Sequence, residues 1–594
     1  MPDSTPEAEG PGPWCTTDGP TPDTHGPGPA PAPPAEPCDL AVIGAGPAGL
    51  AGAVAASGLG LSVTLLDGAD RPGGQFHRHP DPALGAARPG ALHHDWSVFT
   101  GLYHRLTSSA VTRLTGHHVW TVVRDGDLWA VHAVTGPDGD GDGDGDGDRD
   151  GDSDDGAGDG GRPVCVRARA VLFATGSHER HLPFPGWTLP GVVAAGGAQA
   201  MLKSGLVLPG RRVVVAGSGP LLLAVASALA AAGARVPVVV EASAYRAYAR
   251  VPRALLAAPH KLVEGAAHGA ALLRHRVPLR TRSAVTRAHG TDRVEAVTVS
   301  RLDRHWRPVP GTGRRIACDA LAVGHGLVPQ VELALGLGCA TRRTPDGTYA
   351  LVLDGVQATT VPGVFAAGET GGVGGAQLAY TEGELAGVAA AAHLLGRSAL
   401  VRTARVRELG RRRARLRAFA DAMARAHAPG PGWTRWLDDG TDVCRCEEVT
   451  AGRVREAVAD YGARDARTVK LLTRAGMGWC QGRVCGTAVA CLAEAAPGPR
   501  QPPSPERRPL AAPVPLGVLA ALDTEETGTR DPDPDPDPDP DPDPDDHPSH
   551  DTAIATATAT ADITATTATA TADTPAEDSA TATDAQACSP PDEQ

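Results

Sequence analysis

The 594-residue chain has few aromatic residues and almost no lysine. Phe, Trp and Tyr together make up 4% of the sequence, and lysine occurs only at Lys203, Lys261 and Lys470. Surfaces that bind nucleic acids combine basic patches with stacking aromatic side chains. The scarcity of aromatic residues and lysine therefore argues against a nucleic-acid partner. The formal net charge of −14 arises mostly from an Asp/Gly-rich insert and an acidic tail, whereas the part between them is rich in arginine.

The chain also lacks an apolar run that would cross a membrane on its own. Residues 1–14 have neither a basic region nor an apolar core, so we expect no signal peptide. The longest apolar stretch, residues 213–240, opens with a glycine turn and carries Arg235 before a β-branched run. This pattern favours strand, turn, helix and strand over a span of about 20 residues. We expect a soluble, cytoplasmic protein without a transmembrane segment.

Three segments lack the large apolar side chains that a core requires. They are residues 1–37, the Asp/Gly insert at 137–161, and residues 497–594, where Asp-Pro and Ala-Thr repeats predominate. Such segments bury too little apolar surface to offset the entropy of the chain. The sequence therefore predicts disorder at both ends and in the insert.

No cysteine pair stands where a flavin-dependent disulfide reductase needs one. The stretch after Gln75 is FHRHPDPALG, and no C-x-x-C occurs between residues 204 and 317. Cys165 and Cys318 are isolated among apolar residues, which is typical of core thiols. We therefore do not expect disulfide reduction. The eleven cysteines of a cytosolic chain indicate metal or redox chemistry instead.

A dinucleotide-binding motif begins at Cys38. The run LAVIG predicts a buried strand, and a glycine turn follows it, made of Gly44, Ala45, Gly46, Pro47 and Gly49. Its glycines allow a tight turn, a close approach of the backbone to a pyrophosphate, and close packing of the next helix. Asp67 ends the second strand, where a carboxylate can accept hydrogen bonds from ribose hydroxyls.

The pattern occurs a second time in RRVVVAGSGPLLLAVASALAAAGARVPVVVE. Gly217 and Gly219 form the turn, Leu222 takes the place of the third glycine, and Glu241 ends the following strand. An acid at this position favours NAD over NADP. Leu222 would hold the helix further from the strand, so NAD(H) binding and an empty fold both remain open.

Three further glycine turns each follow an apolar strand. They are Ala174-Thr175-Gly176, Gly324-His325-Gly326 and Gly368-Glu369. This order is typical of two-dinucleotide flavoproteins, in which one dinucleotide domain interrupts the other. We predict an α/β architecture of three-layer dinucleotide folds. The expected parts are a first domain at 38–203 and 318–398, and a NAD-type domain at 204–317.

Four cysteines near the end of the folded part form two short pairs. An arginine-rich linker helix at 399–440 leads to a module at 441–496, and the pairs in it are Cys444 with Cys446 and Cys480 with Cys485. Four thiolates suit zinc or an iron–sulfur cluster. The C-x-C spacing is tight for zinc and favours a [2Fe–2S] cluster, while zinc and ordinary thiols remain alternatives. Cys491 is expected to be a packed helix residue.

At this point the sequence resembles a known family. CRCEEV and RAGMGWCQGRVC are similar to the bacterioferritin-associated-ferredoxin-like (BFD-like) [2Fe–2S] module. VIGAGPAGL, FPGWTLPGV, GHGLVP and GVFAAGETGGVGGA resemble FAD/NAD(P)-dependent flavoprotein subunits that carry this module. Such subunits occur in hydrogen cyanide synthase, opine oxidase, dye-linked proline or hydroxyproline dehydrogenase, and heterotetrameric sarcosine oxidase. The resemblance spans about residues 38–491.

The resemblance implies two cofactors and a partner. It implies FAD bound at Gly44, Gly46, Gly49, Asp67, Gly74, Gln75, Gly176 and Gly368, and a [2Fe–2S] cluster on Cys444, Cys446, Cys480 and Cys485. Glu369 stands where related flavoproteins often have Asp. The implied partner is an amino-acid-oxidase-like flavoprotein that oxidises a C–N bond. FMN at an interface with the partner stays open.

The sequence therefore supports a main hypothesis and two rivals. In the first, one subunit of an oxidoreductase passes electrons from an amine or amino acid through FAD and the cluster. In the second, NADH reduces FAD and the cluster serves a ferredoxin-like or oxygenase partner. In the third, the arginine-rich helix makes the chain a docking module. No catalytic acid or base can be named, and the substrate stays unknown.

Overall fold

The computed structural model describes residues 36–135, 161–245, 258–494 and 510–527, together with Tyr248, Pro252 and Arg508. Most of the three segments for which we predict disorder lies outside these residues. The exceptions are residues 36–37 and 161 at the segment edges, Arg508, and residues 510–527. Residues 516–527 form helix α13 (Leu516–Thr527), and Val518 on it is buried. The prediction of a disordered tail from residue 497 is therefore wrong for this helix, whose apolar residues stand between low-complexity flanks.

The first sheet has seven strands in the order β3-β2-β1-β6-β5-β4, and β19 pairs with β6. Strands β3, β2, β1, β6 and β19 run parallel, whereas β4, β5 and β6 pair antiparallel. Because β19 comes more than 190 residues after β6 in the chain, the second sheet is inserted between them. The strand bounds are β1 Cys38–Ile43, β2 Val63–Leu66, β3 Thr112–Leu114, β4 His117–Asp125, β5 Leu128–Thr135, β6 Pro163–Phe173 and β19 Val364–Ala366.

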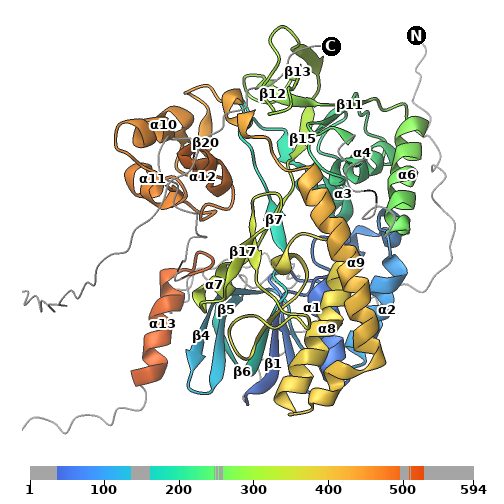
Figure 1. The fold of residues 1–594 in the computed structure, drawn as a ribbon, viewed down its shortest axis with the longest axis vertical. Helices are drawn as coiled ribbons and strands as arrows, with labels where there is room; N and C mark the ends of the chain where they lie inside the picture. The colour runs from blue at the N-terminus through green and yellow to red at the C-terminus, as the bar shows by residue number, and fades with distance from the viewer. Residues whose placement is uncertain are drawn as a thin grey trace, which may run out of the picture. The chain divides into compact units, whose positions relative to one another are not determined.

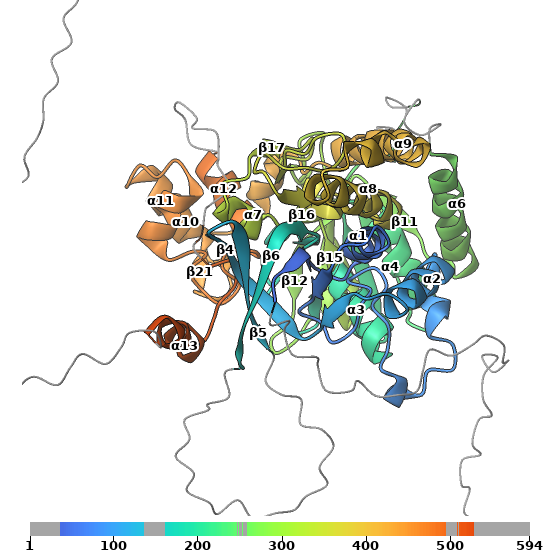
Figure 2. The same cartoon turned by 90° about the horizontal axis from the view of Figure 1, so that it is seen from below.

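Helices α1 (Pro47–Ser57) and α8 (Ala376–Leu394) pack very closely. A Cβ added at Gly383 would lie 2.1 Å from the Ala48 oxygen, and one at Gly387 would lie 2.3 Å from the Gly52 oxygen. Only glycine permits this approach of two helix backbones. Helix α9 (Ala404–Ala426) lies along the far side of α8 (Figures 1 and 2), and α2 (Trp96–Thr107) also contacts α1.

The second sheet is parallel, with five strands in the order β11-β10-β9-β15-β8. The strands are β8 Val192–Ala194, β9 Val213–Gly217, β10 Val239–Glu241, β11 Leu279–Thr281 and β15 Ala320–Gly324. Helices α3 (Ala195–Gly205), α4 (Leu221–Ala231) and α6 (Pro259–Arg274) accompany it, and β12 (Ser283–His289), β13 (Ala296–Arg301) and β14 (Arg314–Ala317) form an antiparallel sheet.

The domain boundaries expected at 203/204 and 317/318 do not fall between the two sheets. Both β8 and β15 pair into the second sheet, although residues 192–194 and 320–324 are expected in the first domain from the sequence. These strands are three and five residues long. Since each is a short apolar run beside glycines, the local sequence does not show which sheet it joins.

Short strand pairs and single-turn helices connect these layers. They are β7 (Ser177–Glu179) with β16 (Leu327–Pro329), β17 (Thr341–Arg343) with β18 (Tyr349–Leu351), α7 (Glu332–Gly336), and the 3-10 turns η1 (Pro82–Leu84), η2 (Pro89–Leu92), η4 (Gly368–Gly371), η5 (Ser398–Arg402) and η6 (Pro431–Trp436).

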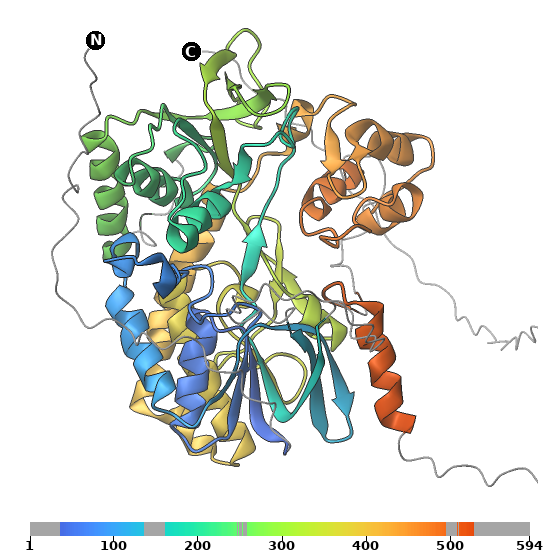
Figure 3. The same ribbon diagram turned by 180° about the vertical axis from the view of Figure 1, so that it is seen from behind.

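The four-cysteine segment forms a small helical module, shown in orange in Figure 3. It comprises β20 (Asp442–Cys444), β21 (Val449–Thr450), α10 (Ala451–Ala459), α11 (Ala466–Thr473) and α12 (Gly486–Glu494). Thr450 and Asp465 cap α10 and α11, because each side chain accepts a hydrogen bond from a backbone N–H of the first turn.

The module packs on the preceding chain through buried tryptophans. Trp433 and Trp436 of η6 share one apolar cluster with Trp306 and with the module residues Val443 and Val469. The Trp306 and Trp436 rings stack with centroids 6.1 Å apart, and the Trp436 indole donates to the Trp306 carbonyl at 2.9 Å. No helix among the described residues is both long and apolar enough to span a membrane.

Candidate functional site: a flavin cradle and a four-thiol module

The first glycine turn has the backbone geometry of a dinucleotide cradle. Gly44 has φ +104°, and a Cβ there would lie 2.3 Å from the Ala174 oxygen. A Cβ on Gly49 would lie 1.7 Å from the Gly44 oxygen. The Asp67 carboxylate accepts hydrogen bonds from the backbone N–H groups of Ala45 and Ala69. The structure therefore brings Gly44, Gly49, Asp67 and Ala174 together at one end of β1, as the sequence predicts.

A second loop packs onto this turn. The Gly73 N–H donates to the Ala45 carbonyl at 2.8 Å, and a Cβ on Gly74 would lie 2.8 Å from the Gly46 Cα. Gln75 is exposed beside them. On the other side, the Thr175 hydroxyl donates to the Gln330 carbonyl at 2.8 Å, and the Gly176 carbonyl accepts from the Gln330 N–H at 3.0 Å.

The third loop, residues 368–375, leads into α8. Gly368 has φ +77°, and a Cβ there would lie 2.9 Å from the Ala48 Cβ. The Glu369 carboxylate accepts hydrogen bonds from Gly374 N–H at 2.9 Å and Gly375 N–H at 3.0 Å. Burial raises the pKa of Glu369, and these two hydrogen bonds oppose the rise. Glu369 therefore stabilises the loop ahead of α8. Its side chain, one methylene longer than that of Asp, forms these hydrogen bonds with backbone groups of the same loop.

Glu382 on α8 holds this loop in place through hydrogen bonds. No sequence pattern indicated this residue. Its side chain has 0% exposure and accepts hydrogen bonds from Arg413 at 3.1 Å and Arg417 at 2.7 Å. It also accepts from the Gly368 N–H at 3.2 Å, while Arg417 donates to the Gly372 carbonyl at 2.5 Å. The arginines of helix α9 are therefore not all exposed to solvent. Arg413 and Arg417 point towards the loop at 368–375, which we call the flavin loop.

We expect Glu382→Ala to destabilise the flavin loop (residues 368–375) strongly. The substitution leaves two largely buried guanidinium groups without their carboxylate, which costs about 3–5 kcal/mol when a buried pair is broken. Glu384→Ala is a matched control on the same helix, because Glu384 pairs with Arg405 at side-chain exposures of 31% and 55%. Exposed pairs contribute about 0–1 kcal/mol. The thermal midpoint of flavin release measures both, and equal shifts would contradict the role of Glu382.

A buried group of titratable side chains lies next to the second flavin loop. His77 is fully buried, its Nε2 is hydrogen-bonded to the Tyr380 hydroxyl at 2.7 Å, and its Nδ1 has no hydrogen-bond partner among the described residues. Burial lowers the pKa of His77 to about 4 and that of Lys203 to about 8. The Lys203 ammonium donates to the Phe76 carbonyl at 3.1 Å. Periodicity in the sequence could not indicate this group, since its members come from three separate segments.

The two histidines next to glycine turns do not show a catalytic arrangement. His325 has 3% exposure, and its ring lies near the rings of Trp306 and Trp436. Burial lowers its pKa to about 3. His178 lies on β7, where burial lowers its pKa to about 4. His325 is therefore a buried side chain, whereas His178 is partly buried.

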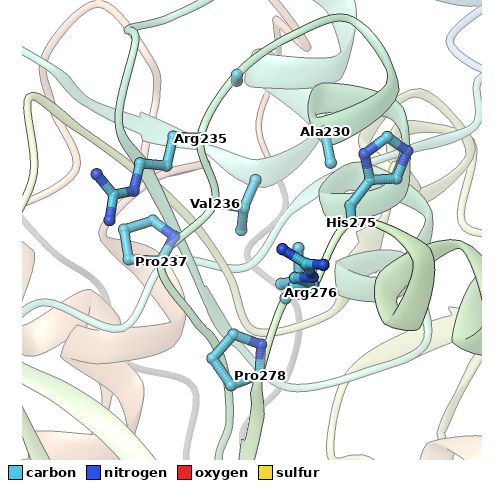
Figure 4. A pocket seen from close by; sticks show the side chains of 9 residues that line it. Ala230, Arg235, Val236, Pro237, His275, Arg276 and Pro278 are labelled. Carbon is cyan, nitrogen blue, oxygen red and sulfur yellow. The ribbon is translucent and has the colours of Figure 1, made fainter.

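The residues predicted for the second dinucleotide site also come together. Gly217 and Gly219 have φ +137° and +120°, and Glu241 accepts a hydrogen bond from the Gly219 N–H at 3.0 Å. A cavity of about 440 Å³ lies at the other end of this sheet (Figure 4), lined by Arg235, His275 and residues before β10 and β11. Ligands of such sheets bind at the carboxyl ends of the strands, so we assign no dinucleotide to this cavity.

The four predicted ligands of the module pair across the two motifs. Cys444 is hydrogen-bonded to Cys485, and Cys446 to Cys480. Hydrogen bonds from the Cys485 thiol and from the backbone N–H groups of Gly476, Glu447 and Cys446 lower the pKa of Cys444 to about 5, against the effect of burial. Such N–H groups stabilise the charge of an iron–sulfur cluster.

Glycines keep the space around these thiols free. A Cβ on Gly478 would lie 2.4 Å from the Cys446 Cβ, and Gly476 and Gly482 have φ +90° and +76°. A mononuclear zinc site needs four ligands around one centre, whereas two pairs of thiols suit a cluster with two irons. The residues present therefore fit a [2Fe–2S] cluster.

An FAD cradle, a second dinucleotide fold and a four-thiol module define a class of protein: an FAD-dependent oxidoreductase with a [2Fe–2S] domain. Comparison with protein families agrees. The model of the pyridine nucleotide-disulphide oxidoreductases matches residues 38–383, and that of the BFD-like [2Fe-2S] binding domain matches residues 443–494. The chain belongs to the pyridine nucleotide-disulphide oxidoreductase family. Its fold class and its two cofactors, FAD and the cluster, are thereby confirmed.

Several relatives are subunits of oxidoreductases. The chain is 34% identical to the HcnB subunit of hydrogen cyanide synthase from Pseudomonas aeruginosa, over 75% of its own length and 90% of that protein. It is 33% identical to an opine oxidase subunit of Agrobacterium tumefaciens, covering 76% of this chain and 84% of that one. The crystal structure of L-proline dehydrogenase from P. horikoshii has the same fold, with a TM-score of 0.54 and 20% identity over 82% of this chain and 79% of that chain.

Proposed function

We propose that this chain is the electron-transferring flavoprotein subunit of a complex that oxidises a C–N bond in an amino acid or secondary amine. One observation supports this most directly: an FAD cradle and a four-thiol module occur together in a chain that aligns with 90% of a hydrogen cyanide synthase subunit. Subunits of opine oxidase and sarcosine oxidase are further relatives, the latter over 27% of its own length. The names of all three describe them as subunits.

The residues of this chain bind and position the cofactors in this proposal. The loops at Gly44, Gly74 and Gly368 hold FAD, and Glu382 with Arg417 keeps the last of these loops in place. FAD takes two electrons from an organic substrate and can release them singly, as a [2Fe–2S] cluster requires. The partner is an amino-acid-oxidase-like flavoprotein, and we place the complex in the cytoplasm.

The test is an anaerobic titration of the co-purified complex. We expect an amino acid or N-alkylated amino acid, from a panel that includes sarcosine, L-proline and an opine, to bleach the flavin absorbance. The chain purified without its partner should not respond to the same panel. A Cys444→Ala complex is the control, because its flavin should still bleach while transfer to an external one-electron acceptor slows. Rapid bleaching of the isolated chain by NADH alone, with no response to any amine, would contradict the proposal.

A further inference from the structure

The chain contains two dinucleotide turns that can be compared with each other. In both, the acid at the end of the second strand accepts a hydrogen bond from a backbone N–H of the turn: Asp67 from Ala45, and Glu241 from Gly219. The acids differ in what lies in front of them. Asp67 is partly exposed, whereas Glu241 has 1% exposure. The carboxylate that would meet a ribose is therefore accessible in the first fold and covered in the second.

His427 covers it. This residue directly follows α9, and its Nδ1 lies 3.1 Å from the Ser218 hydroxyl and 3.5 Å from the Glu241 carboxylate. Its Nε2 is hydrogen-bonded to the Tyr248 hydroxyl at 2.6 Å. His427 is itself 8% exposed, so it is packed into the site rather than resting on the surface.

The polar groups of the second turn are already paired with one another. The remaining Glu241 oxygen accepts from the Ser243 N–H at 2.8 Å, and the Ser218 and Ser243 hydroxyls lie 3.0 Å apart. Ser218 and Ser243 are 3% and 6% exposed. A ribose would have to displace His427 and break these contacts before it could reach the carboxylate. The residues present do not fit NAD(H) in this arrangement.

The helix that follows the glycine turn also differs between the two folds, and this difference too disfavours a dinucleotide in the second fold. A Cβ on Gly49 would lie 1.7 Å from the Gly44 oxygen, so the first fold requires glycine there. The second fold has Leu222 at this position, with 1% exposure. A leucine can occupy it only if the helix lies further from the strand, which also moves the N–H groups that would meet a pyrophosphate.

We propose that His427 closes the second dinucleotide fold to NAD(H), so that this fold serves as a structural platform. The imidazole fills the place of the adenosine ribose between Ser218, Glu241 and Tyr248. NADH therefore cannot deliver electrons from this fold. This inference concerns binding alone, and it does not depend on which amine the complex oxidises.

The closing residue belongs to the segment that carries the cluster module. α9 contributes Arg413 and Arg417 to the flavin loop, His427 follows at its end, and Trp433 and Trp436 then pack against the module. The continuous segment from α9 to Trp436 thus contacts the flavin loop, occupies the second nucleotide site and packs against the module.

Equilibrium binding of NAD+ and ADP-ribose to the FAD- and cluster-loaded protein tests the inference. By calorimetry we expect no binding to the wild-type protein at concentrations up to about 1 mM, the weak end of ordinary affinities. We expect His427→Ala to bind ADP-ribose at least about tenfold more tightly than wild type, since one to two hydrogen bonds no longer oppose it. His393→Ala is the matched control, because His393 is an exposed histidine at the end of α8.

Flavin content and near-UV circular dichroism report whether each variant is folded. The wild-type measurement needs no variant, so it tests closure even if His427→Ala loses its fold. Micromolar binding of NAD+ to the wild-type protein would overturn the inference. Equal affinity of wild type and a folded His427→Ala would also overturn it, as would a failure of both to bind, because His427 would then not be the obstruction.

Discussion

Replacing Cys485 with alanine is expected to abolish the iron–sulfur cluster while FAD stays bound. Cys485 is 1% exposed and hydrogen-bonded to Cys444, so its loss removes one of the four thiolates that two irons require. Iron and acid-labile sulfide should fall from about two of each per chain to near zero. Because the flavin loops lie on other elements, the flavin absorbance should remain, and it shows that the protein is folded.

Cys491→Ala is the control for this result. Cys491 lies six residues further on, within α12, and burial raises the pKa of its thiol. It packs against the apolar cluster of the module, and the contacts described for its thiol include none of the four predicted ligands. Iron content should therefore stay close to that of the wild-type protein. Full retention of the cluster in Cys485→Ala, or its loss in Cys491→Ala, would show that the ligands are assigned wrongly.

The second large effect is expected at the third glycine of the FAD turn. Gly49→Ala places a Cβ 1.7 Å from the Gly44 oxygen, a backbone atom that cannot move aside as a side chain can. Overpacking a tight site costs about 1–3 kcal/mol or more. At about 1.4 kcal/mol per factor of ten, we expect FAD affinity to fall by about 5- to 150-fold. Fluorescence of released flavin during dialysis measures this loss.

Gly101→Ala provides the comparison for Gly49→Ala. Gly101 lies within α2, and a Cβ there meets no atom within 4 Å. Alanine is favoured over glycine in a helix interior by about 0.5–1 kcal/mol, so this variant should keep its FAD and be slightly more stable. If Gly49→Ala retained FAD as well as Gly101→Ala does, the first turn would not be the flavin cradle.

The features that the sequence predicts well are motifs whose residues lie close together in the chain. Gly44, Gly46 and Gly49 lie within six positions, and Cys444 with Cys446 within three. Their spacing reflects a local requirement of one turn or one ligand pair. Each motif therefore predicts its local structure without information from distant parts of the chain. The structure brings the members of each motif together, and the family models match the two regions that contain them.

The features that the sequence could not show depend on contacts between distant residues. Glu382 meets Arg413 and Arg417 across two helices, and His427 meets Ser218 across 209 positions. In the sequence, these arginines look like part of a solvated charged face, and a single histidine carries no pattern. The sheet to which β8 and β15 belong is likewise decided by pairing partners rather than by composition.

Electron exchange between FAD and a [2Fe–2S] cluster within this chain is the central claim. Stepwise anaerobic reduction of the purified protein, followed by visible absorbance and electron paramagnetic resonance, tests it most directly. We expect flavin bleaching to be accompanied by a paramagnetic iron–sulfur signal of roughly one spin per chain, since a [2Fe–2S] cluster accepts a single electron. Flavin reduction without such a signal, in protein that contains one zinc and no acid-labile sulfide, would contradict it.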